Sequence, residues 1–286
     1  MYTVDTITAL REQVTEWKKE GLAVGLCPTM GFLHEGHASL MANSVKQCDK
    51  TVASVFVNPI QFGPNEDLET YPRDFERDCK LLEAEGVDLV FHPEASEMYA
   101  ADFCTFVDIN TLSDTLCGAS RPVHFRGVCT VITKLLNTVK PDKIFFGQKD
   151  AQQLAIVRRM VRDLNFDVEV VGCPIVRESD GLAKSSRNTY LSPEERKAAL
   201  ILSRTIRLGQ DIVAGGETDG KVLIDSMKDN LSKEPMADVE YVELVDGMSM
   251  QPISVVKQGY LVAMAVRIGK TRLIDNFLIG DPAIEF

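Results

Sequence analysis

Two histidines lie three residues apart where the sequence predicts a change from strand to helix. His34 and His37 end the stretch Cys27-Pro-Thr-Met-Gly-Phe-Leu-His-Glu-Gly-His37. Gly31 and Gly36 let the backbone approach a ligand closely. A helix beginning near Gly36 would direct free N–H groups and its positive dipole end toward the loop, with both imidazoles on one side. This arrangement suits a nucleotide triphosphate, although a turn with two exposed polar residues explains the same stretch.

A loop with two amide side chains follows the second predicted strand. Asn58 and Gln61 lie in the segment 58–64, which two prolines stiffen. Amides donate and accept hydrogen bonds without carrying charge, so they suit a neutral substrate that is rich in hydroxyl groups. Taken alone, the segment is more simply explained as an ordinary turn rich in proline and glycine.

A lysine follows the strand predicted at 143–146 and stands at the start of a predicted helix. Lys149 places a mobile cation at the strand's end, where it can meet phosphate oxygens. Gly147 permits close approach of a ligand, and Gln153 lies one turn further along the face of Lys149 or Asp150. By itself the segment is only a helix cap, but beside a phosphate site it becomes a candidate clamp.

A second group of cations, Lys184-Ser-Ser-Arg187, combines two positive charges with two hydroxyls. This combination suits a triphosphate as charge builds on departing pyrophosphate; a solvated basic loop is the alternative. His92 and His124 have no metal-ligand spacing and are expected to be structural or peripheral. The sequence contains neither a P-loop nor a GxGxxG motif. We therefore predict no metal site built by the protein and expect any Mg²⁺ to be held mainly by substrate phosphates.

The elements that must position these loops alternate between strands and helices in the first part of the chain. Strands are predicted at 22–27, 51–57, 87–91, 143–146 and 168–171, and helices at 7–17, 36–46, 72–86, 128–139 and 152–164. Such alternation predicts an α/β domain with a parallel sheet covered on both faces. Ligands of these sheets bind beyond the carboxyl ends of the strands, where the loops above would lie.

The pattern changes after about residue 176. Helices are predicted at 193–214 and 219–232, followed by strands at 239–246, 259–267 and 272–279. Helices and strands that occur in separate blocks indicate a smaller α+β domain. The boundary near 175–190 would then be a tight junction, and a cleft there would form a second wall of the site.

Composition excludes several classes of protein. The chain has 286 residues, of which 45% are hydrophobic, and this is enough for two domains with cores. Its net charge of −11 argues against a nucleic-acid-binding surface. No apolar run is long enough for a membrane span, no secretory signal is visible, and the seven cysteines are scattered without a CxxC pair. We therefore expect a soluble cytoplasmic protein with no nucleic-acid or membrane partner.

Taken together, these loops resemble the pantothenate synthetase (pantoate–β-alanine ligase) family. The blocks that carry the resemblance are PTMGFLHEGH at 28–37, FVNPIQFGPNEDLETYPRD at 56–74, HFRGVCTVITKLLN at 124–137, FFGQKDAQQL at 145–154, VRESDGLAKSSRNTYLS at 176–192 and LIDN at 273–276. They follow the family's order and span nearly the whole chain, so together they are far more specific than any one block.

The resemblance implies a fold, a reaction and an assembly. It implies a Rossmann-like domain of the nucleotidylyltransferase type at 1–175, which binds ATP and pantoate, and a smaller α+β lid domain at 176–286. The reaction would be an AMP-forming ligation of (R)-pantoate with β-alanine through pantoyl adenylate, which gives pantothenate and diphosphate on the route to coenzyme A. A homodimer is implied, as is ATP as a substrate with Mg²⁺ held mainly by its phosphates.

The resemblance also assigns roles to site residues. His37 is expected to donate a proton with His34 beside it, and Lys149 and Arg187 are expected to neutralise developing charge. Gln61 and Gln153 would hold pantoate, and Gln61 would also help receive β-alanine. The expected ATP-binding residues are Met30, Gly31, Phe32, Leu33, His34, Glu35, Gly36, His37, Gly147, Gln148, Lys149, Asp150, Val176, Lys184, Ser185, Ser186 and Arg187.

The sequence departs from the family's pattern at four positions. Phe32 stands where alanine is usual, Gln148 where glutamate is usual, Ala151 where an aromatic residue is common, and Lys184 where methionine is usual. None of these changes removes a group with an obvious chemical role. Gln148 removes a charge that bears on the handling of magnesium.

Three other classes of protein share parts of the pattern. Cytidylyl- and adenylyltransferases have HxGH-type loops and would make a nucleotide-linked product without an amide. A fragment of a class I tRNA synthetase is disfavoured by the net charge of −11 and by the lack of an RNA-binding domain. A nucleotide-binding regulator would bind ATP without turnover. Exchange of pyrophosphate into ATP that depends strictly on pantoate separates all of these.

Overall fold

The computed structural model describes residues 1–64 and 66–280. Asn65, inside the block 56–74, and the last six residues of the predicted C-terminal domain lie outside this description. The chain forms two compact units. The first unit comprises residues 1–109, 121–148 and 156–173, and the second comprises residues 110–120, 149–155 and the chain from 174 onward. The predicted functional division at 175/176 stays a prediction.

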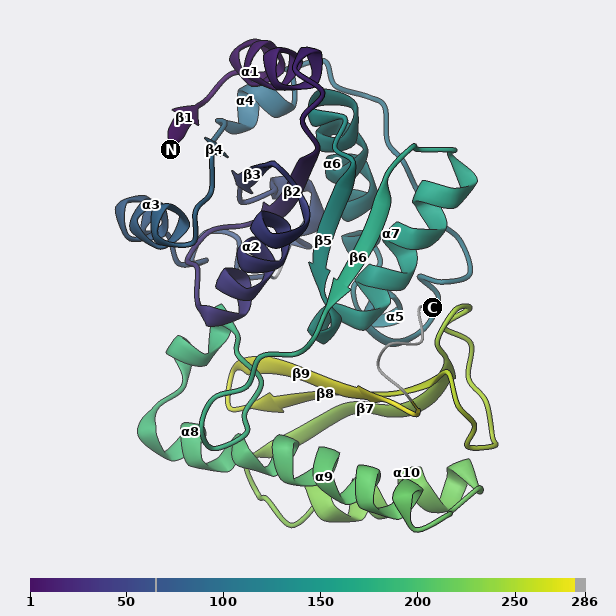
Figure 1. Ribbon diagram of the computed structural model, residues 1–286. Coiled ribbons are helices and arrows are strands. Elements are labelled where there is room, and N and C mark those ends of the chain that lie inside the picture. The colour runs from purple at the N-terminus through teal and green to yellow at the C-terminus, as the bar shows by residue number, and fades with distance from the viewer. Residues whose placement is uncertain (65, 281–286) are drawn as a thin grey trace. The chain divides into compact units, whose positions relative to one another are not determined.

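The first unit is built on a parallel sheet. Its strands are β1 (Tyr2–Val4), β2 (Val24–Thr29), β3 (Lys50–Val55), β4 (Leu89–Phe91), β5 (Lys143–Gly147) and β6 (Glu169–Cys173). Their order is β1-β4-β3-β2-β5-β6, and every pairing is parallel (Figure 1). Because β2 pairs with β3 on one side and with β5 on the other, the order of the sheet reverses at β2. The carboxyl ends of β2 and β5 are therefore the place where such sheets bind ligands.

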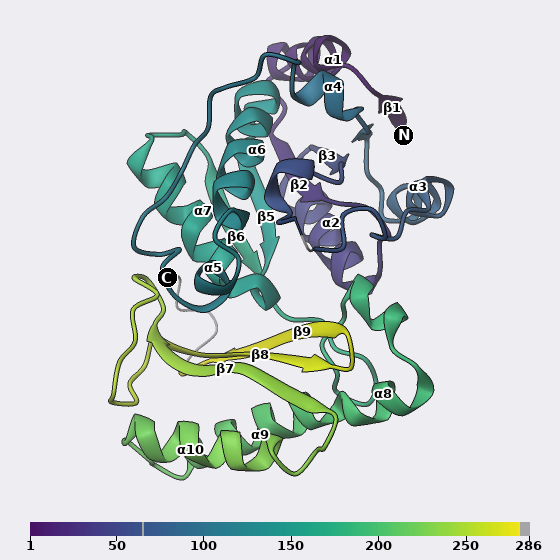
Figure 2. The ribbon, with the colours of Figure 1, turned by 180° about the vertical axis from the view of Figure 1, so that it is seen from behind.

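Helices cover both faces of this sheet, as predicted. They are α1 (Ile7–Lys19), α2 (Glu35–Gln47), α3 (Phe75–Ala84), α4 (Ala95–Met98), α6 (His124–Val139) and α7 (Ala151–Asp163), with short turns η1 (Pro59–Gln61) and η2 (Gln148–Asp150). Helix α2 lies over one face and α6 over the other (Figures 1 and 2). The central strands carry fully buried side chains on both faces, among them Leu26, Cys27, Ile144 and Phe145. The predicted α/β class is confirmed.

Three predicted helix boundaries need correction. The helix predicted from Pro72 begins at Phe75, because the Asp74 side chain caps it by accepting from the Arg77 N–H. The helix predicted from Val128 begins at His124, since the glycine in its first turn weakens the helical pattern there. The single helix predicted at 193–214 is divided into α8 (Pro193–Ala198) and α9 (Leu200–Ala214). The strand β1 was not predicted, because three residues give too short a pattern.

The second unit is an antiparallel sheet packed against two helices. Its strands β7 (Ala237–Asp246), β8 (Tyr260–Ile268) and β9 (Thr271–Leu278) pair in that order. Helices α9 and α10 (Gly220–Leu231) lie against one face of the sheet (Figure 2). Leu202, Ile206, Leu223, Met227, Val262 and Met264 are among the buried side chains between them. The short helix α5 (Leu116–Ser120) also belongs to this unit, and the predicted α+β class is confirmed.

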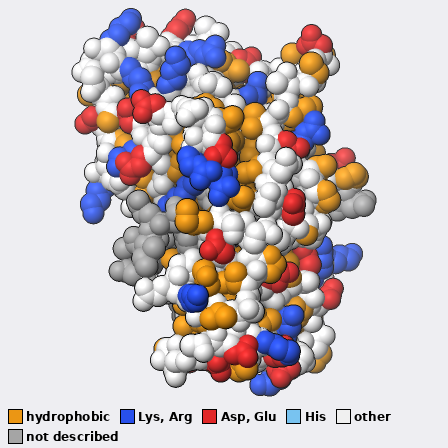
Figure 3. Space-filling model, turned by 90° about the vertical axis from the view of Figure 1, so that its right-hand side faces the viewer, with side chains coloured by type: hydrophobic (Ala, Val, Ile, Leu, Met, Phe, Trp, Pro, Cys, Tyr) orange, Lys and Arg blue, Asp and Glu red, His pale blue; other side chains and the backbone are white. Residues whose placement is uncertain are grey.

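The helices and the surface charge bear on membrane binding and on charged partners. No helix in the described part of the chain combines the length and the apolar character that crossing a membrane requires. On the face shown in Figure 3, Lys and Arg side chains lie among Asp and Glu side chains. That face therefore carries charges of both signs.

Candidate active site

A buried carboxylate holds the loop that follows β2. Asp78, on α3, is 1% exposed, and its two oxygens accept from the N–H groups of Phe32 and Leu33 at 2.7 Å each. Gly31 and Phe32 have φ values of 82° and 51°, in the left-handed region that costs a residue such as phenylalanine about 1 kcal/mol or more. Burial raises the pKa of the Asp78 carboxyl, and the two N–H donors oppose this rise. The carboxylate thus fixes a strained loop in place.

The two histidines form the N-terminal cap of α2. His34 is the N-cap residue, and its Nδ1 accepts from the Gly36 N–H at 3.1 Å. Three residues later, the Nδ1 of His37 accepts from the His34 N–H at 3.2 Å. This is a capping box in which imidazoles replace the usual hydroxyl and carboxylate. The ring centroids lie 4.1 Å apart.

These hydrogen bonds fix the protonation of the two rings. An imidazole nitrogen that accepts a hydrogen bond carries no proton, so both Nδ1 atoms are bare and each neutral ring carries its proton on Nε2. Both rings therefore have an Nε2–H donor at the positive end of a helix dipole. Such donors are suited to phosphate oxygens.

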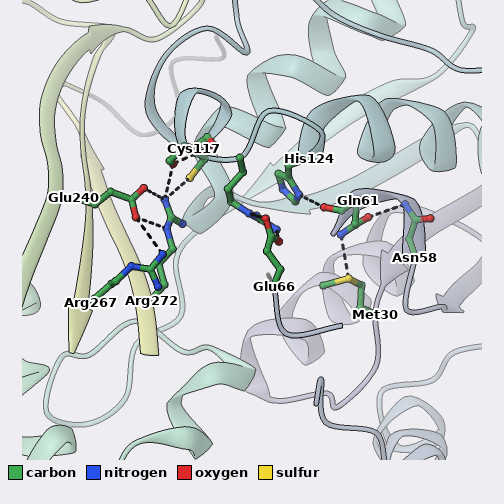
Figure 4. Close-up of polar contacts among 11 residues, drawn as sticks. Met30, Asn58, Gln61, Glu66, Cys117, His124, Glu240, Arg267 and Arg272 are labelled. Atoms are coloured by element: carbon green, nitrogen blue, oxygen red, sulfur yellow. Dashed lines mark hydrogen bonds and ion pairs between the residues drawn. The ribbon is translucent and has the colours of Figure 1, made fainter. Parts of the chain in front are cut away.

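Gln61, in η1, is held by the neighbouring loops. Its Oε1 accepts from Asn58 Nδ2 at 2.9 Å, and its Nε2 donates to the sulfur of Met30 at 3.1 Å (Figure 4). Asn58 also donates to the Gly127 carbonyl and accepts from the Tyr99 hydroxyl at 2.7 Å. The structure thereby brings together Met30 and Gln61, which follow β2 and β3 respectively. Gln61 is 7% exposed, so its orientation is fixed by buried partners.

Helix α6 packs closely against η1. His124 Nδ1 lies 3.0 Å from the Gln61 carbonyl, and because a carbonyl only accepts, this nitrogen carries the ring proton. A Cβ on Gly127 would lie 2.4 Å from the Cα of Gln61, so only glycine allows this approach. Arg121, just before α6, forms an ion pair with Glu66. Burial alone would raise the pKa of Glu66, but the hydrogen bond and charge of Arg121 lower it.

The end of β5 is open around Gly147. Within the described residues, a Cβ on Gly147 would meet no atom within 4 Å beyond its chain neighbours. Gln148 then begins η2. The glycine therefore leaves room for close approach of a ligand, as its position in the sequence predicts.

In the second unit, the end of η2 and the start of α7 are each anchored by hydrogen bonds. The Lys149 carbonyl accepts from Asn276 Nδ2 at 2.8 Å, and the Lys149 ammonium lies 3.7 Å from the Asp150 carboxylate. Gln152 is buried, and its Nε2 donates to the carbonyls of Leu112 and Thr115 at 2.8 Å each. The adjacent Gln153 is partly exposed. Lys149, in η2, and Gln153, in α7, thus lie in two consecutive elements that these hydrogen bonds anchor.

The loop with the second group of cations is a hairpin followed by a short helix. The Val176 carbonyl accepts from the Lys184 N–H at 3.0 Å, and Gly181, with φ of 95°, turns the chain between them. The turn itself is formed by Ser179, Asp180 and Gly181. The Ser185 hydroxyl then caps η3 (Ser186–Tyr190) by accepting from the Arg187 N–H at 3.3 Å. The hairpin therefore ends where the cations begin.

Glu178 ties this hairpin to the following helices. It accepts from Asn188 Nδ2 and from Arg196, each at 2.9 Å. Arg196 also pairs with Asp180 at 2.7 Å. Although burial would raise the pKa of Glu178, the bonds from Asn188 and Arg196 lower it, so the carboxylate is ionised. This network stabilises one conformation of the loop.

Several residues that position the site were not singled out from the sequence. Asp78, Tyr99 and Asn276 each bind a predicted site residue or its loop from a distant part of the chain. Residues that pair across a long stretch of chain show no fixed spacing in the sequence, so no sequence pattern predicted these contacts. His92 and His124, which were expected to be structural or peripheral, each bond a backbone carbonyl through Nδ1.

A parallel sheet whose order reverses at a central strand, with a histidine-capped helix after that strand, defines a doubly wound α/β protein, and proteins of this class bind their ligands at the switch point. The sequence profile of the family described as Pantoate-beta-alanine ligase matches residues 2–278. The chain belongs to this family, which confirms the resemblance, and it is an enzyme of the ligase class.

Individual relatives agree with this assignment. The chain is 57% identical to the pantothenate synthetase of Ruminiclostridium cellulolyticum over 277 residues, which cover 97% of this chain and 98% of the relative. The pantothenate synthetase of Enterococcus faecalis is 54% identical over 277 residues, covering 97% and 98%. These relatives match the chain over almost its whole length.

Two solved structures share the whole fold. The pantothenate synthetase of Thermus thermophilus superposes with a TM-score of 0.94 at 44% identity, covering 98% of this chain and 100% of that one. The pantoate–β-alanine ligase of Francisella tularensis has a TM-score of 0.80 at 30% identity, covering 99% and 100%. The latter was solved in complex with "Beta-gamma ATP and Beta-alanine".

Proposed function

We propose that this enzyme condenses (R)-pantoate with β-alanine in two steps that use ATP. A carboxylate is a poor acyl donor to an amine, because its leaving group would be oxide. The pantoate carboxylate therefore attacks the α-phosphate of ATP, which forms pantoyl adenylate and releases diphosphate. The deprotonated amine of β-alanine then attacks the acyl carbon and displaces AMP, which gives pantothenate. Family membership and the ligands of the Francisella tularensis relative support this proposal.

The capping box of α2 is the observation that carries the proposal. It leaves the ring protons of His34 and His37 on Nε2 at the N-terminus of a helix beside the sheet's switch point. There the donors and the helix dipole stabilise the charge that grows on the departing diphosphate. In this proposal His37 is the proton donor.

The remaining predicted site residues keep their proposed roles. Lys149 and Arg187 neutralise charge on the β- and γ-phosphates, and the loop from Lys184 to Arg187 closes on them. Gln61 and Gln153 bind the hydroxyls of pantoate, and Gln61 also receives β-alanine. The residues from Met30 to His37, those from Gly147 to Asp150, and Val176 bind ATP.

Three further features belong to the same proposal. Mg²⁺ accompanies ATP, is held mainly by its phosphates and offsets their charge. The part of the chain at 176–286 acts as a lid that keeps water from the adenylate, because water would hydrolyse it. The enzyme works as a cytoplasmic homodimer. Sedimentation equilibrium tests this, because a dimer has twice the molar mass of the single chain.

Isotope exchange between pyrophosphate and ATP tests the reaction. We expect exchange only when pantoate is present, and formation of pantothenate and AMP when β-alanine is added. Exchange without pantoate, or a product that keeps the nucleotide, would identify a nucleotidyltransferase instead. ATP binding without any exchange would identify a regulator.

A further inference from the structure

Two neighbouring residues of β9 contact both segments of the second unit to which we assign the phosphates. Asp275 and Asn276 belong to the LIDN block at 273–276, to which the proposed chemistry gives no role. Both are buried, with exposed fractions of 1% and 6%. Asp275 binds Arg177 in the hairpin, and Asn276 binds the backbone of Lys149. One strand thus holds two cation-bearing loops.

The contact of Asp275 fixes the hairpin. The two guanidinium nitrogens of Arg177 donate to the two carboxylate oxygens at 2.7 and 2.9 Å. Arg177 also donates to the Gly181 carbonyl at 3.1 Å, so it ties the first arm of the hairpin to its turn. A buried carboxylate that lost this partner would be an unpaired charge, which is strongly unfavourable. Asp275 on β9 therefore holds the first arm and the turn of the hairpin, and Lys184 stands at the end of the second arm.

The contact of Asn276 fixes the backbone that carries Lys149. Its Nδ2 donates to the Lys149 carbonyl at 2.8 Å, in the turn η2. A lysine side chain has many rotamers, and a fixed backbone restricts the positions that its ammonium can reach. Asn276 therefore limits the region that the Lys149 ammonium can reach, although it bonds only the backbone of that residue.

We propose that Asp275 and Asn276 are positioning residues, which hold Lys149 and the segment 176–187, made of the hairpin and the start of η3, in a fixed relation so that their cations act on one triphosphate. This inference rests on the proposed function. Neither residue touches the substrates in this proposal; each acts through the loop it binds. Because the two contacts go to different loops, their effects are separable by mutation.

The test is a crossed set of double-mutant cycles in the full-length enzyme, with ATP affinity measured by calorimetry. Asn276→Ala and Asp275→Asn should each weaken ATP binding about tenfold, as expected for one lost buried contact. In a Lys149→Ala background the effect of Asn276→Ala should vanish while that of Asp275→Asn persists. In an Arg187→Ala background the effect of Asp275→Asn should vanish while that of Asn276→Ala persists. The reason is that the effects of mutations on the binding free energy add for independent residues and do not add for coupled ones.

Two variants serve as matched controls. Asn230→Ala removes the hydrogen bond from the Asn230 side-chain amide to the Thr205 hydroxyl in the same unit. Glu240→Gln weakens the bidentate pair of Glu240 with Arg272, which lies on β9 as Asp275 does (Figure 4). Both should lower thermal stability and leave ATP affinity unchanged. If Asp275→Asn does not fold, the double variant Asp275→Asn with Arg177→Gln removes both charges together and takes its place.

The inference is overturned if Asn276→Ala and Asp275→Asn leave ATP affinity unchanged, or lower it equally in every background. Its failure is distinguishable from failure of the proposed reaction. A wild-type enzyme that exchanges pyrophosphate but lacks the crossed pattern refutes only the positioning roles. A wild-type enzyme that shows the crossed pattern without pantoate-dependent exchange refutes the reaction and keeps the positioning roles.

Discussion

At the scale of single residues, His34 and His37 serve the fold and the proposed chemistry with different atoms. Their Nδ1 atoms accept backbone N–H groups at the start of α2, which leaves Nε2 to carry the ring proton. A helix cap is worth about 1 kcal/mol, whereas a well-placed donor to developing charge is worth about 3 kcal/mol. The free energy lost with the cap is therefore smaller than that lost with the donor, and measurements can tell the two losses apart.

Replacing His37 tests this separation. His37→Ala should lower pantoate-dependent pyrophosphate exchange a hundredfold or more, on the order of 3 kcal/mol, and lower the free energy of unfolding by about 1 kcal/mol. His37→Gln should restore much of the stability, because glutamine at this position can complete a capping box. It should not restore exchange. Exchange near the wild-type rate in either variant would show that the histidine is only a cap.

Gln61 and Gln153 should set the preference for pantoate. A buried amide left without its partner costs about 1–3 kcal/mol, so an analogue that lacks one hydroxyl should react roughly five- to a hundredfold more slowly. In Gln61→Ala and Gln153→Ala enzymes the difference between pantoate and the analogue should shrink. The ratio of kcat/KM values for the two substrates measures it. An unchanged ratio in both variants would place the pantoate pocket elsewhere.

At the scale of elements, the close approach of α6 to η1 controls the position of Gln61. A Cβ on Gly127 would lie 2.4–2.6 Å from backbone atoms of Ile60 and Gln61, and backbone yields less readily than a flexible side chain. Glycine inside a helix normally weakens it by about 0.5–1 kcal/mol relative to alanine. Here the packing reverses that preference.

Gly127→Ala should therefore destabilise the protein, by about 1–3 kcal/mol as is typical of overpacking, in place of the usual gain. Because η1 must shift, the KM for pantoate should rise. The control is Gly63→Ala, whose Cβ would meet its nearest atom, in Glu66, at 3.4 Å. Urea unfolding and steady-state kinetics of the two variants give the answer, and a Gly127→Ala protein as stable and active as wild type would contradict the packing argument.

The elements were largely predictable, and their long-range contacts were not. Alternating apolar runs located β2, β3, β5 and the helices between them, because buried faces impose a period on the sequence. The histidine pair was found because its spacing is local. The carboxylate that fixes its loop, Asp78, lies 46 residues from Phe32, and a separation of that size leaves no periodic trace.

The make-up of the second compact unit could not be predicted from the sequence for the same reason. The segments 110–120 and 149–155 lie inside the run of alternating strands and helices, yet they pack with the second unit. Gln152 shows why, since its side chain bonds carbonyls of residues 37 and 40 positions earlier. No change of composition marks either segment.

At the scale of the whole molecule, the response to acid should depend on the pair Glu240–Arg272. Arg272 donates two hydrogen bonds to Glu240 and lowers the pKa of that carboxyl from its ordinary value of 4.5 to about 2. A carboxyl with a lowered pKa in the folded state stabilises the fold above its unfolded pKa. That stability is lost as the pH falls from about 4.5 toward 2.

Comparing wild type with Glu240→Gln isolates this contribution. The difference in free energy of unfolding should be on the order of 2 kcal/mol above about pH 5, a value reduced by partial exposure of both side chains. It should approach zero near pH 2. Urea titrations at several pH values measure it, and a difference that does not change with pH would show that the charge of Glu240 is irrelevant.

The three-part composition of the second unit has a consequence for protein synthesis. The Thr115 hydroxyl bonds the Met250 carbonyl, which the ribosome adds 135 residues later. At about 5–20 residues per second, the segment 110–120 waits on the order of ten seconds for this partner. During that time Leu112 and Leu116, which are buried in the finished protein, lack the later strands that belong to their unit. We therefore expect this segment of the nascent chain to be open to capture by chaperones, or by other nascent chains, until those strands are made.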